Sequence, residues 1–122
     1  MKRLFFGMFL LGSLLVRPLS AQIAKPSGFP EFWKKFQAAV LKEDSEAVAG
    51  MTYLPFYWGA TLNKAGFLKV YPNLFDAKAR ECFRKGELTE DGAFQILFCG
   101  RLMYRFGADA GTWRMLEISD ND

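Results

Sequence analysis

The spacing of the hydrophobic residues changes along the chain, and this change restricts the fold more than any other feature of the sequence. In the first part, large apolar side chains recur every three or four residues, at Phe29, Phe32, Trp33, Phe36, Ala39 and Val40. This spacing predicts an amphipathic helix over 30–42. From Ala93 to Phe106 the apolar residues instead alternate with others, which predicts one long strand with a bulge or bend at Gly100. We therefore expect an α+β domain in which N-terminal helices pack on a curved antiparallel sheet that ends in a long C-terminal hairpin.

Two shorter helices are predicted from residues that favour helix ends. Asp44 suits the N-cap of a helix that ends at Gly50, because its side chain can accept a hydrogen bond from a free backbone N–H. Asn63 suits the same position for a helix over 63–71. Pro72 is expected to end that helix, since a proline has no N–H to donate.

The cysteines suggest a covalent link between a helix and the long strand. Asp76 and Gly86 delimit a predicted helix over 77–85, whose inner face carries Cys82. Cys82 and Cys99 are the only cysteines of the chain. In an oxidising compartment such a pair usually forms a structural disulfide, which would add about 3 kcal/mol by restricting the unfolded chain. The alternative, a redox-active pair, usually has a closer spacing such as C-x-x-C.

The start of the chain has the three-part pattern of a secretory signal peptide. Lys2 and Arg3 precede an apolar run over 4–16, and the small residues around Ala21 offer a cleavage site. The run is shorter than the ~20 residues that a membrane-spanning helix needs. We expect residues 1–21 to be removed, leaving a periplasmic or secreted protein without stable membrane insertion. An uncleaved anchor is the alternative.

The remaining chain has the length of one domain. Residues 22–28 are expected to form a flexible leader, 29–119 a single α+β domain, and 120–122 a frayed tail.

The composition excludes several chemistries. Without histidine, the chain cannot carry out Ser-His or Cys-His catalysis or build a histidine-ligated metal site, and two cysteines cannot form a Cys₄ cluster. We expect no metal and no cofactor. Lys2, Arg3 and Arg17 account for the net charge of +3, so the rest of the chain is neutral. A nucleic-acid partner is therefore not expected.

The predicted C-terminal hairpin brings two charged residues together. A returning strand over 112–119 follows the loop sequence GADAG. Placing Phe106 opposite Thr112 puts Arg101 opposite Glu117, which would form a cross-strand salt bridge.

Two motifs carry a resemblance to a known superfamily. The first is F-W-x-x-F-x-x-A-V from Phe32 to Val40, followed by Asp44 and a short helix; the second is F-G-x-D-x-G-x-W from Phe106 to Trp113. Together they resemble the nuclear transport factor 2-like (cystatin-like) superfamily, especially its small exported bacterial members of unassigned role. The resemblance implies a curved sheet wrapped around a long helix with a cone-shaped cavity between them. Members use that cavity as an enzyme site or ligand pocket, or fill it and bind proteins. Enzymatic members often rely on an Asp–His pair, which this chain cannot form, or on Asp and Tyr.

The first functional hypothesis is an exported binding module with a pocket between helix and sheet. Arg101 and Glu117 would form its polar floor, while Tyr53, Tyr57 and Trp58 would line its mouth. If the helices cover the opposite face of the sheet, Tyr104 and Arg114 become the polar candidates. An ordinary salt bridge on a solvated surface is the alternative interpretation of the Arg101–Glu117 pair.

The second hypothesis is an envelope protein-interaction factor, such as an inhibitor, an immunity-type factor or an accessory subunit. The segment from Thr52 to Trp58 would then be an exposed aromatic anchor, since Tyr and Trp are frequent at interfaces. The same apolar segment predicts a strand, which Pro55 places at an edge or bulge, or else a loop that covers the core. An enzyme with Asp109 or Glu117 as base and a tyrosine donor is the least favoured hypothesis, because nothing converges on either carboxylate.

Overall fold

The computed structural model describes residues 27–120. The predicted signal peptide over 1–21 and most of the predicted leader over 22–28 lie outside the described residues, as do 121 and 122. The elements follow in the order α2 (Phe29–Leu41), α3 (Ser45–Gly50), β1 (Phe56–Tyr57), β2 (Thr61–Leu62), α4 (Lys64–Leu74), α5 (Ala77–Lys85), β3 (Leu88–Asp91), β4 (Phe94–Cys99), β5 (Leu102–Asp109) and β6 (Thr112–Asp120).

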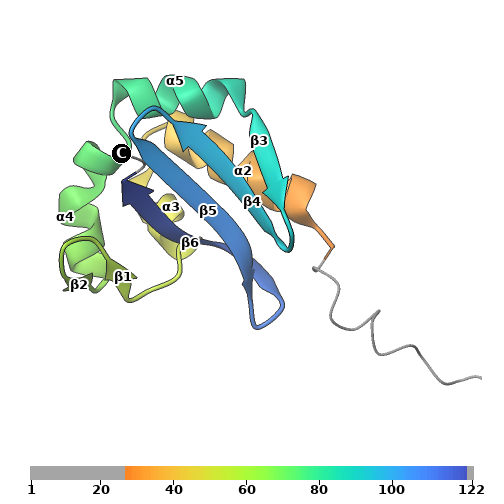
Figure 1. Ribbon diagram of the computed structural model, residues 1–122. Helices are drawn as coiled ribbons and strands as arrows, with labels where there is room; N and C mark the ends of the chain where they lie inside the picture. Colours follow the sequence, from red (N-terminus) through yellow and green to blue (C-terminus); the bar gives the residue numbers. More distant parts are fainter. Residues whose placement is uncertain (1–26, 121–122) are drawn as a thin grey trace, which may run out of the picture.

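The strands β3 to β6 form an antiparallel sheet in sequential order, and β1 pairs only with β2. Helices α2 and α3 lie behind this sheet, α5 runs across its upper end in this view, and α4 and the β1–β2 hairpin flank its β6 edge (Figure 1). Helices followed by an antiparallel sheet confirm the predicted α+β class.

The helix starts predicted from the sequence are confirmed. In each of three helices the cap side chain accepts a hydrogen bond from the backbone N–H three residues ahead: Asp44 for α3, Asn63 for α4 and Asp76 for α5. Gly86 follows the last residue of α5 with a φ of 62°, a left-handed conformation that suits glycine.

Pro72 does not end α4 as predicted. The helix continues to Leu74, and the N–H of Phe75 still donates to the carbonyl of Tyr71. A proline so close to the helix end removes few hydrogen bonds. Leu74 and Phe75 are both buried, and burial of these two large side chains offsets that loss.

The predicted strand over 52–58 is mostly irregular. Thr52 makes an isolated parallel bridge to Met115 of β6, and regular pairing begins only at Phe56, directly after Pro55. The proline has no N–H to contribute to a strand ladder, which explains why pairing begins after it.

The stretch from Ala93 to Phe106 forms two strands rather than the single predicted strand. Gly100 and Arg101 connect β4 to β5, and Cys99 pairs with Leu102 across this turn. Gly100 has a φ of 63°, as the first central residue of a type II′ hairpin turn requires.

This turn changes which side chains share a face. Because Cys99 and Leu102 are paired, the alternation shifts by one residue after the turn. Tyr104 therefore faces the helices together with its partner Leu97, whereas Arg105 points to the other side of the sheet with its partner Ile96.

The register of β5 and β6 also differs from the prediction. Ala110 and Gly111 form a second two-residue turn with φ values of 52° and 82°, so β5 and β6 are both longer than expected. An irregularity between Arg105 and Phe106 then shifts the pairing. As a result Arg105, and not Arg101, lies opposite Glu117.

Arg101 instead lies in the β4–β5 turn. Its Nη2 atom is 3.6 Å from Oδ2 of Asp120, the last residue of β6. Asp120 pairs with Leu102, so this residue of the predicted frayed tail belongs to the sheet.

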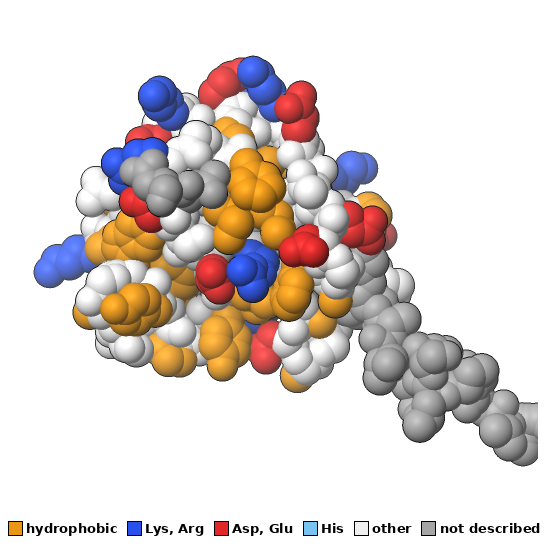
Figure 2. Space-filling view, viewed as in Figure 1, with side chains coloured by type: hydrophobic (Ala, Val, Ile, Leu, Met, Phe, Trp, Pro, Cys, Tyr) orange, Lys and Arg blue, Asp and Glu red, His pale blue; other side chains and the backbone are white. Residues whose placement is uncertain are grey.

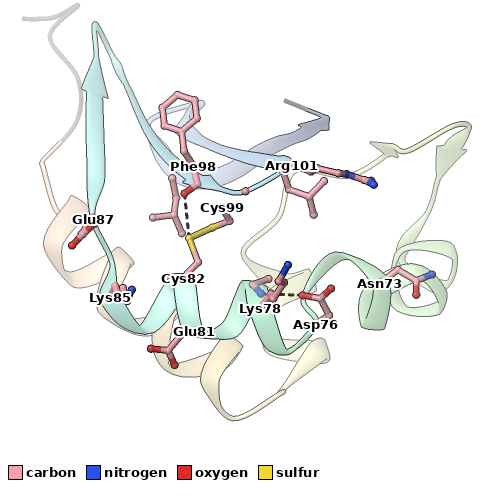
Figure 3. Close-up of a pocket in the computed structure, with 14 residues that line it drawn as sticks. Asn73, Asp76, Lys78, Glu81, Cys82, Lys85, Glu87, Phe98, Cys99 and Arg101 are labelled. Carbon is pink, nitrogen blue, oxygen red and sulfur yellow. Dashed lines mark hydrogen bonds between the residues drawn. A yellow bond between two sulfur atoms is a disulfide. The ribbon is translucent and has the colours of Figure 1, made fainter. Parts of the chain in front are cut away.

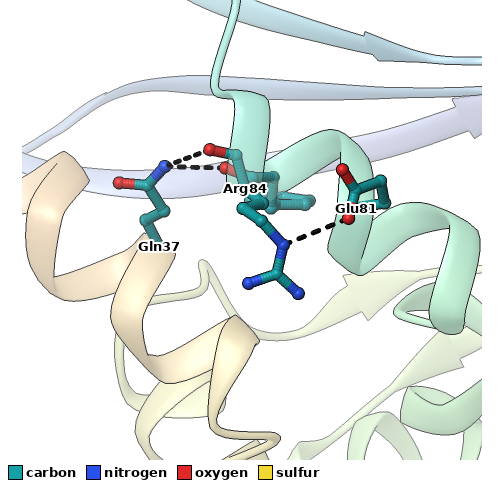
Figure 4. A network of polar contacts seen from close by, with 4 residues as sticks. Gln37, Glu81 and Arg84 are labelled. Atoms are coloured by element: carbon teal, nitrogen blue, oxygen red, sulfur yellow. Dashed lines mark hydrogen bonds and ion pairs between the residues drawn. The ribbon is translucent and has the colours of Figure 1, made fainter.

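Two links hold α5 in place. The predicted disulfide between Cys82 and Cys99 is confirmed and joins α5 to β4, with 5.7 Å between the Cα atoms. On the other side, Nε2 of Gln37 in α2 donates to the carbonyl of Phe83 at 2.7 Å and, at 3.4 Å, to that of Arg84 (Figure 4).

Candidate functional site

Aromatic rings fill the space between α2 and the sheet, where the sequence suggested a pocket. Phe36 is fully buried and lies within 6.5 Å, centroid to centroid, of the rings of Phe75, Phe83 and Phe106. Side chains from the helices and from the inner face of the sheet therefore form one packed core, and the site must be sought elsewhere.

Two tyrosines belong to this core. Tyr104, a predicted site residue, is fully buried and its hydroxyl donates to the carbonyl of Leu74. Burial raises the pKa of the Tyr104 hydroxyl. Burial also raises the pKa of Tyr71 to about 12, although the positive charge of Arg80 opposes this shift. The hydroxyl of Tyr71 has no hydrogen-bond partner among the described residues.

Four of the seven residues predicted to line a pocket meet at a hollow beside β6. This hollow, the aromatic trough, has a volume of about 690 Å³. One wall is formed by residues 53–59, which include β1, and carries Tyr53, Pro55, Tyr57, Trp58 and Gly59. The other wall is Leu116–Asp120 of β6. Tyr53, Tyr57, Trp58 and Glu117 therefore line one site, but this site lies at the edge of the sheet and not under the helix.

The trough borders the side of the sheet that faces away from the helices. We call the trough and this outer side together the open face. Its outer side chains include Phe94, Ile96 and Phe98 of β4, Met103 and Arg105 of β5, and Leu116 and Glu117 of β6. No described helix lies over it (Figure 1). Figure 2 shows apolar side chains around a pair of opposite charges on this face.

The exposed large hydrophobic side chains of the described chain all lie on the open face. Tyr53 is 44 % exposed, Tyr57 69 % and Phe98 47 %. Single exposed apolar residues are common on soluble proteins, but grouped ones indicate an interaction surface.

The apolar packing of the open face requires a glycine beneath it. A Cβ atom on Gly107 would lie 2.7 Å from Cδ1 of Leu116 and 2.8 Å from Cδ1 of Phe94. Ile96 is only 6 % exposed although it does not belong to the helix-side core. The open face therefore has its own small layer of packed side chains.

Arg105 lies at the centre of this layer and was not predicted as a site residue. Its guanidinium carbon is 5.2 Å from the centroid of the Phe94 ring, and Nη2 is 3.6 Å from Oε2 of Glu117. Its Nε atom is buried and has no hydrogen-bond partner among residues 27–120.

Arg101 lines a different hollow, of about 640 Å³, between α5 and the β4–β5 turn (Figure 3). The disulfide lies in this hollow, and Sγ of Cys82 is 3.3 Å from the carbonyl oxygen of Phe98. Exposed side chains of both charges, including Lys78 and Glu81, surround it. This arrangement favours no single ligand charge.

The carboxylates considered for catalysis do not converge on one site. Asp109 lies near the end of β5, with Oδ2 3.4 Å from Nε of Arg114, whereas Glu117 pairs with Arg105. Arg114, the other polar candidate, also donates to the carbonyl of Gly50. Within the described part of the chain, no three Cys, Asp or Glu side chains are grouped so that they could hold a metal ion.

Comparisons with protein-family models, curated proteins and solved structures give no match to this chain. Among residues 27–120, no helix has both the length and the apolar character needed to cross a membrane. The function is therefore inferred from the surface itself.

Proposed function

We propose that the protein is an exported binding module that docks a polypeptide partner of the cell envelope on its open face. The observation that carries this proposal is that the exposed large hydrophobic residues of the described chain are all part of the open face. A partner that covers this side would remove their apolar surface from water, which is the main source of binding free energy.

The residue types of the open face support the proposal. Interface centres are enriched in aromatic residues, Met and Arg, and are poor in Lys. The open face contains Tyr57, Trp58, Phe98, Met103 and Arg105 and no lysine. All lysines of the described chain lie in helices or helix ends, at Lys34, Lys35, Lys42, Lys64, Lys69, Lys78 and Lys85.

Two observations support export. Disulfides persist in oxidising compartments, and the Cys82–Cys99 bond joins two elements of the fold. The predicted signal peptide over 1–21 supplies a route to such a compartment.

Membership of the nuclear transport factor 2-like superfamily remains part of this proposal. The order of helices followed by an antiparallel sheet agrees with what the resemblance implies. A core filled by rings such as Phe36 favours the members that fill the cavity and bind proteins over those that use it as an enzyme site.

Affinity purification of surface variants tests the proposal. The Tyr57→Ser/Phe98→Ser double variant removes two exposed rings from the open face, and Lys34→Ser/Lys35→Ser is the matched control on α2. We expect the wild-type protein and the lysine variant to retain the same polypeptide from the exported fraction, and the aromatic variant to lose it. Retention of that polypeptide by a folded aromatic variant would contradict the proposal. Circular dichroism checks that each variant is folded.

A further inference from the structure

We propose that the aromatic trough selects a partner segment that combines apolar side chains with lysine or arginine. This inference rests on the proposed function and names the chemistry of the polypeptide that the open face would bind.

The charge of the trough carries the inference. Its charged residues are Glu117 and Asp120, and no lysine or arginine lines it. The arginines that pair with these two carboxylates, Arg105 with Glu117 and Arg101 with Asp120, do not line the trough themselves. A segment with positive charge would therefore complement the trough, and an acidic segment would be repelled.

Glu117 retains the capacity to bind a second cation. Its side chain is 47 % exposed, and the 3.6 Å between its Oε2 and Nη2 of Arg105 exceeds the length of a good hydrogen bond. Arg105 itself does not line the trough, so the side of the carboxylate that faces the trough is open to an incoming ammonium or guanidinium group.

The rings of the trough suit the same ligand. Tyr53 and Tyr57 are largely exposed, and Trp58 lines the wall beside them. Aromatic faces attract cations and also cover the methylene stems of Lys and Arg side chains. A basic and apolar segment can use both properties at once.

The dimensions favour a peptide segment over a single small ion. The wall formed by Leu116–Asp120 spans roughly 17 Å at the usual rise of a strand. This length corresponds to about five residues of an extended chain.

Two synthetic peptides with the same apolar centre test the inference. The probes are Ac-Lys-Leu-Phe-Leu-Lys-NH2 and Ac-Glu-Leu-Phe-Leu-Glu-NH2, titrated into the ¹⁵N-labelled, oxidised protein. Binding is followed by NMR through the indole N–H of Trp58 and the backbone amides of Leu116–Asp120. We expect the basic peptide to bind about tenfold more tightly at low ionic strength, and added salt to reduce this ratio.

Charge-neutralising variants locate the effect. Glu117→Gln should lower the affinity ratio of the two peptides toward one, whereas Glu31→Gln, an exposed carboxylate in the first turn of α2, should leave it unchanged. A lower ratio in both variants would overturn the inference, because the preference would then reflect the charge of the whole protein.

Other outcomes separate this inference from the proposed function. Equal binding of both peptides at the trough overturns the charge selection and leaves the docking function intact. Binding of the peptides to the helix side alone contradicts both. If a neutral oligosaccharide such as chitotriose shifts the trough resonances and neither peptide does, the ligand is not a polypeptide and the inference fails.

Discussion

The two sides of the sheet differ in how completely their apolar side chains are buried. On the helix side, Phe106 and Tyr104 are fully buried against rings from α2 and α5 and against the ring of Phe75. On the open face, Phe98 of the neighbouring strand remains 47 % exposed. Burial on the helix side stabilises the fold, so that side explains why the chain is ordered. The exposed apolar side chains of the open face do not stabilise the fold in this way, and for this reason we propose that this face binds a partner.

The sharpest test of this difference removes one phenylalanine from each side. Phe36→Ala should lower the free energy of unfolding by about 3–5 kcal/mol, because it leaves a cavity among packed rings. Phe98→Ala should cost less than about 1 kcal/mol, since nearly half of its surface is already in water. Urea unfolding of the oxidised protein measures both values. Similar losses for the two variants would mean that the open face contributes to folding as the core does.

The disulfide is expected to make the second largest contribution to stability, and it joins α5 on the helix side to β4 of the sheet. The Cys82→Ser/Cys99→Ser variant should lose about 3 kcal/mol of unfolding free energy, because the unfolded chain regains the freedom that the link removes. Thermal unfolding of both forms measures the difference. An unchanged midpoint would show that other contacts, such as the hydrogen bonds of Gln37, already hold α5 in place.

Alkaline pH should weaken the helix side through its buried tyrosines. The pKa of Tyr71 is raised to about 12 and that of Tyr104 is also raised, whereas an unfolded tyrosine ionises near pH 10. Stability from these groups is complete below pH 10 and declines above it, as the unfolded state releases protons that the folded state retains. We expect a decline of about 1.4 kcal/mol per pH unit for each tyrosine between pH 10 and 12. Urea unfolding across this range should show a smaller decline for Tyr71→Phe, and an unchanged profile would contradict the assignment.

The smallest expected effect on stability comes from removing the hydroxyl of Tyr71 or of Tyr104, and the two variants form a matched pair. Tyr104→Phe should cost about 1 kcal/mol, because it leaves the buried carbonyl of Leu74 without its donor. Tyr71→Phe removes a hydroxyl that has no partner among the described residues, so its stability should stay equal or rise slightly. Calorimetry compares the stability of the two variants directly. A larger loss of stability for Tyr71→Phe than for Tyr104→Phe would contradict this assignment of their hydrogen bonds.

The sequence predicted the helices well because their signals are local. Asp44, Asn63 and Asp76 each form a cap within three residues, and the aromatic spacing of α2 depends on one helix face. The location of Cys82 on the inner face of its helix followed from the same kind of local pattern, and its pairing with Cys99 followed because the chain has only two cysteines.

The sheet was predicted less well because its signals are ambiguous. Both faces of the sheet carry apolar residues, such as Ile96 on the outer side and Leu97 on the inner. The alternation therefore does not show which residues face the helices. Gly100 was interpreted as a bulge or bend within one strand, although a glycine before Arg101 is also compatible with a type II′ turn. Arg105 was missed for this reason.

The candidate site was predicted in part. The aromatic segment suggested Tyr53, Tyr57 and Trp58 as a group, and in the structure all three line one hollow, because rings concentrated around a proline are difficult to bury together. Their pairing with Arg101 was wrong, since the second turn places a φ of 52° on Ala110, a residue type for which a left-handed conformation is uncommon. Long-range register depends on such turns and cannot be derived from alternation alone.

Site-specific photo-cross-linking tests the central claim most directly. A benzophenone amino acid placed at Tyr57 or Phe98 samples the open face, and the same group at Lys35 samples the helix side. The account predicts that, in the producing cell, both open-face positions cross-link to one and the same polypeptide and the Lys35 position does not. Cross-linking of that polypeptide from Lys35 alone, with none from Tyr57 or Phe98, would contradict it.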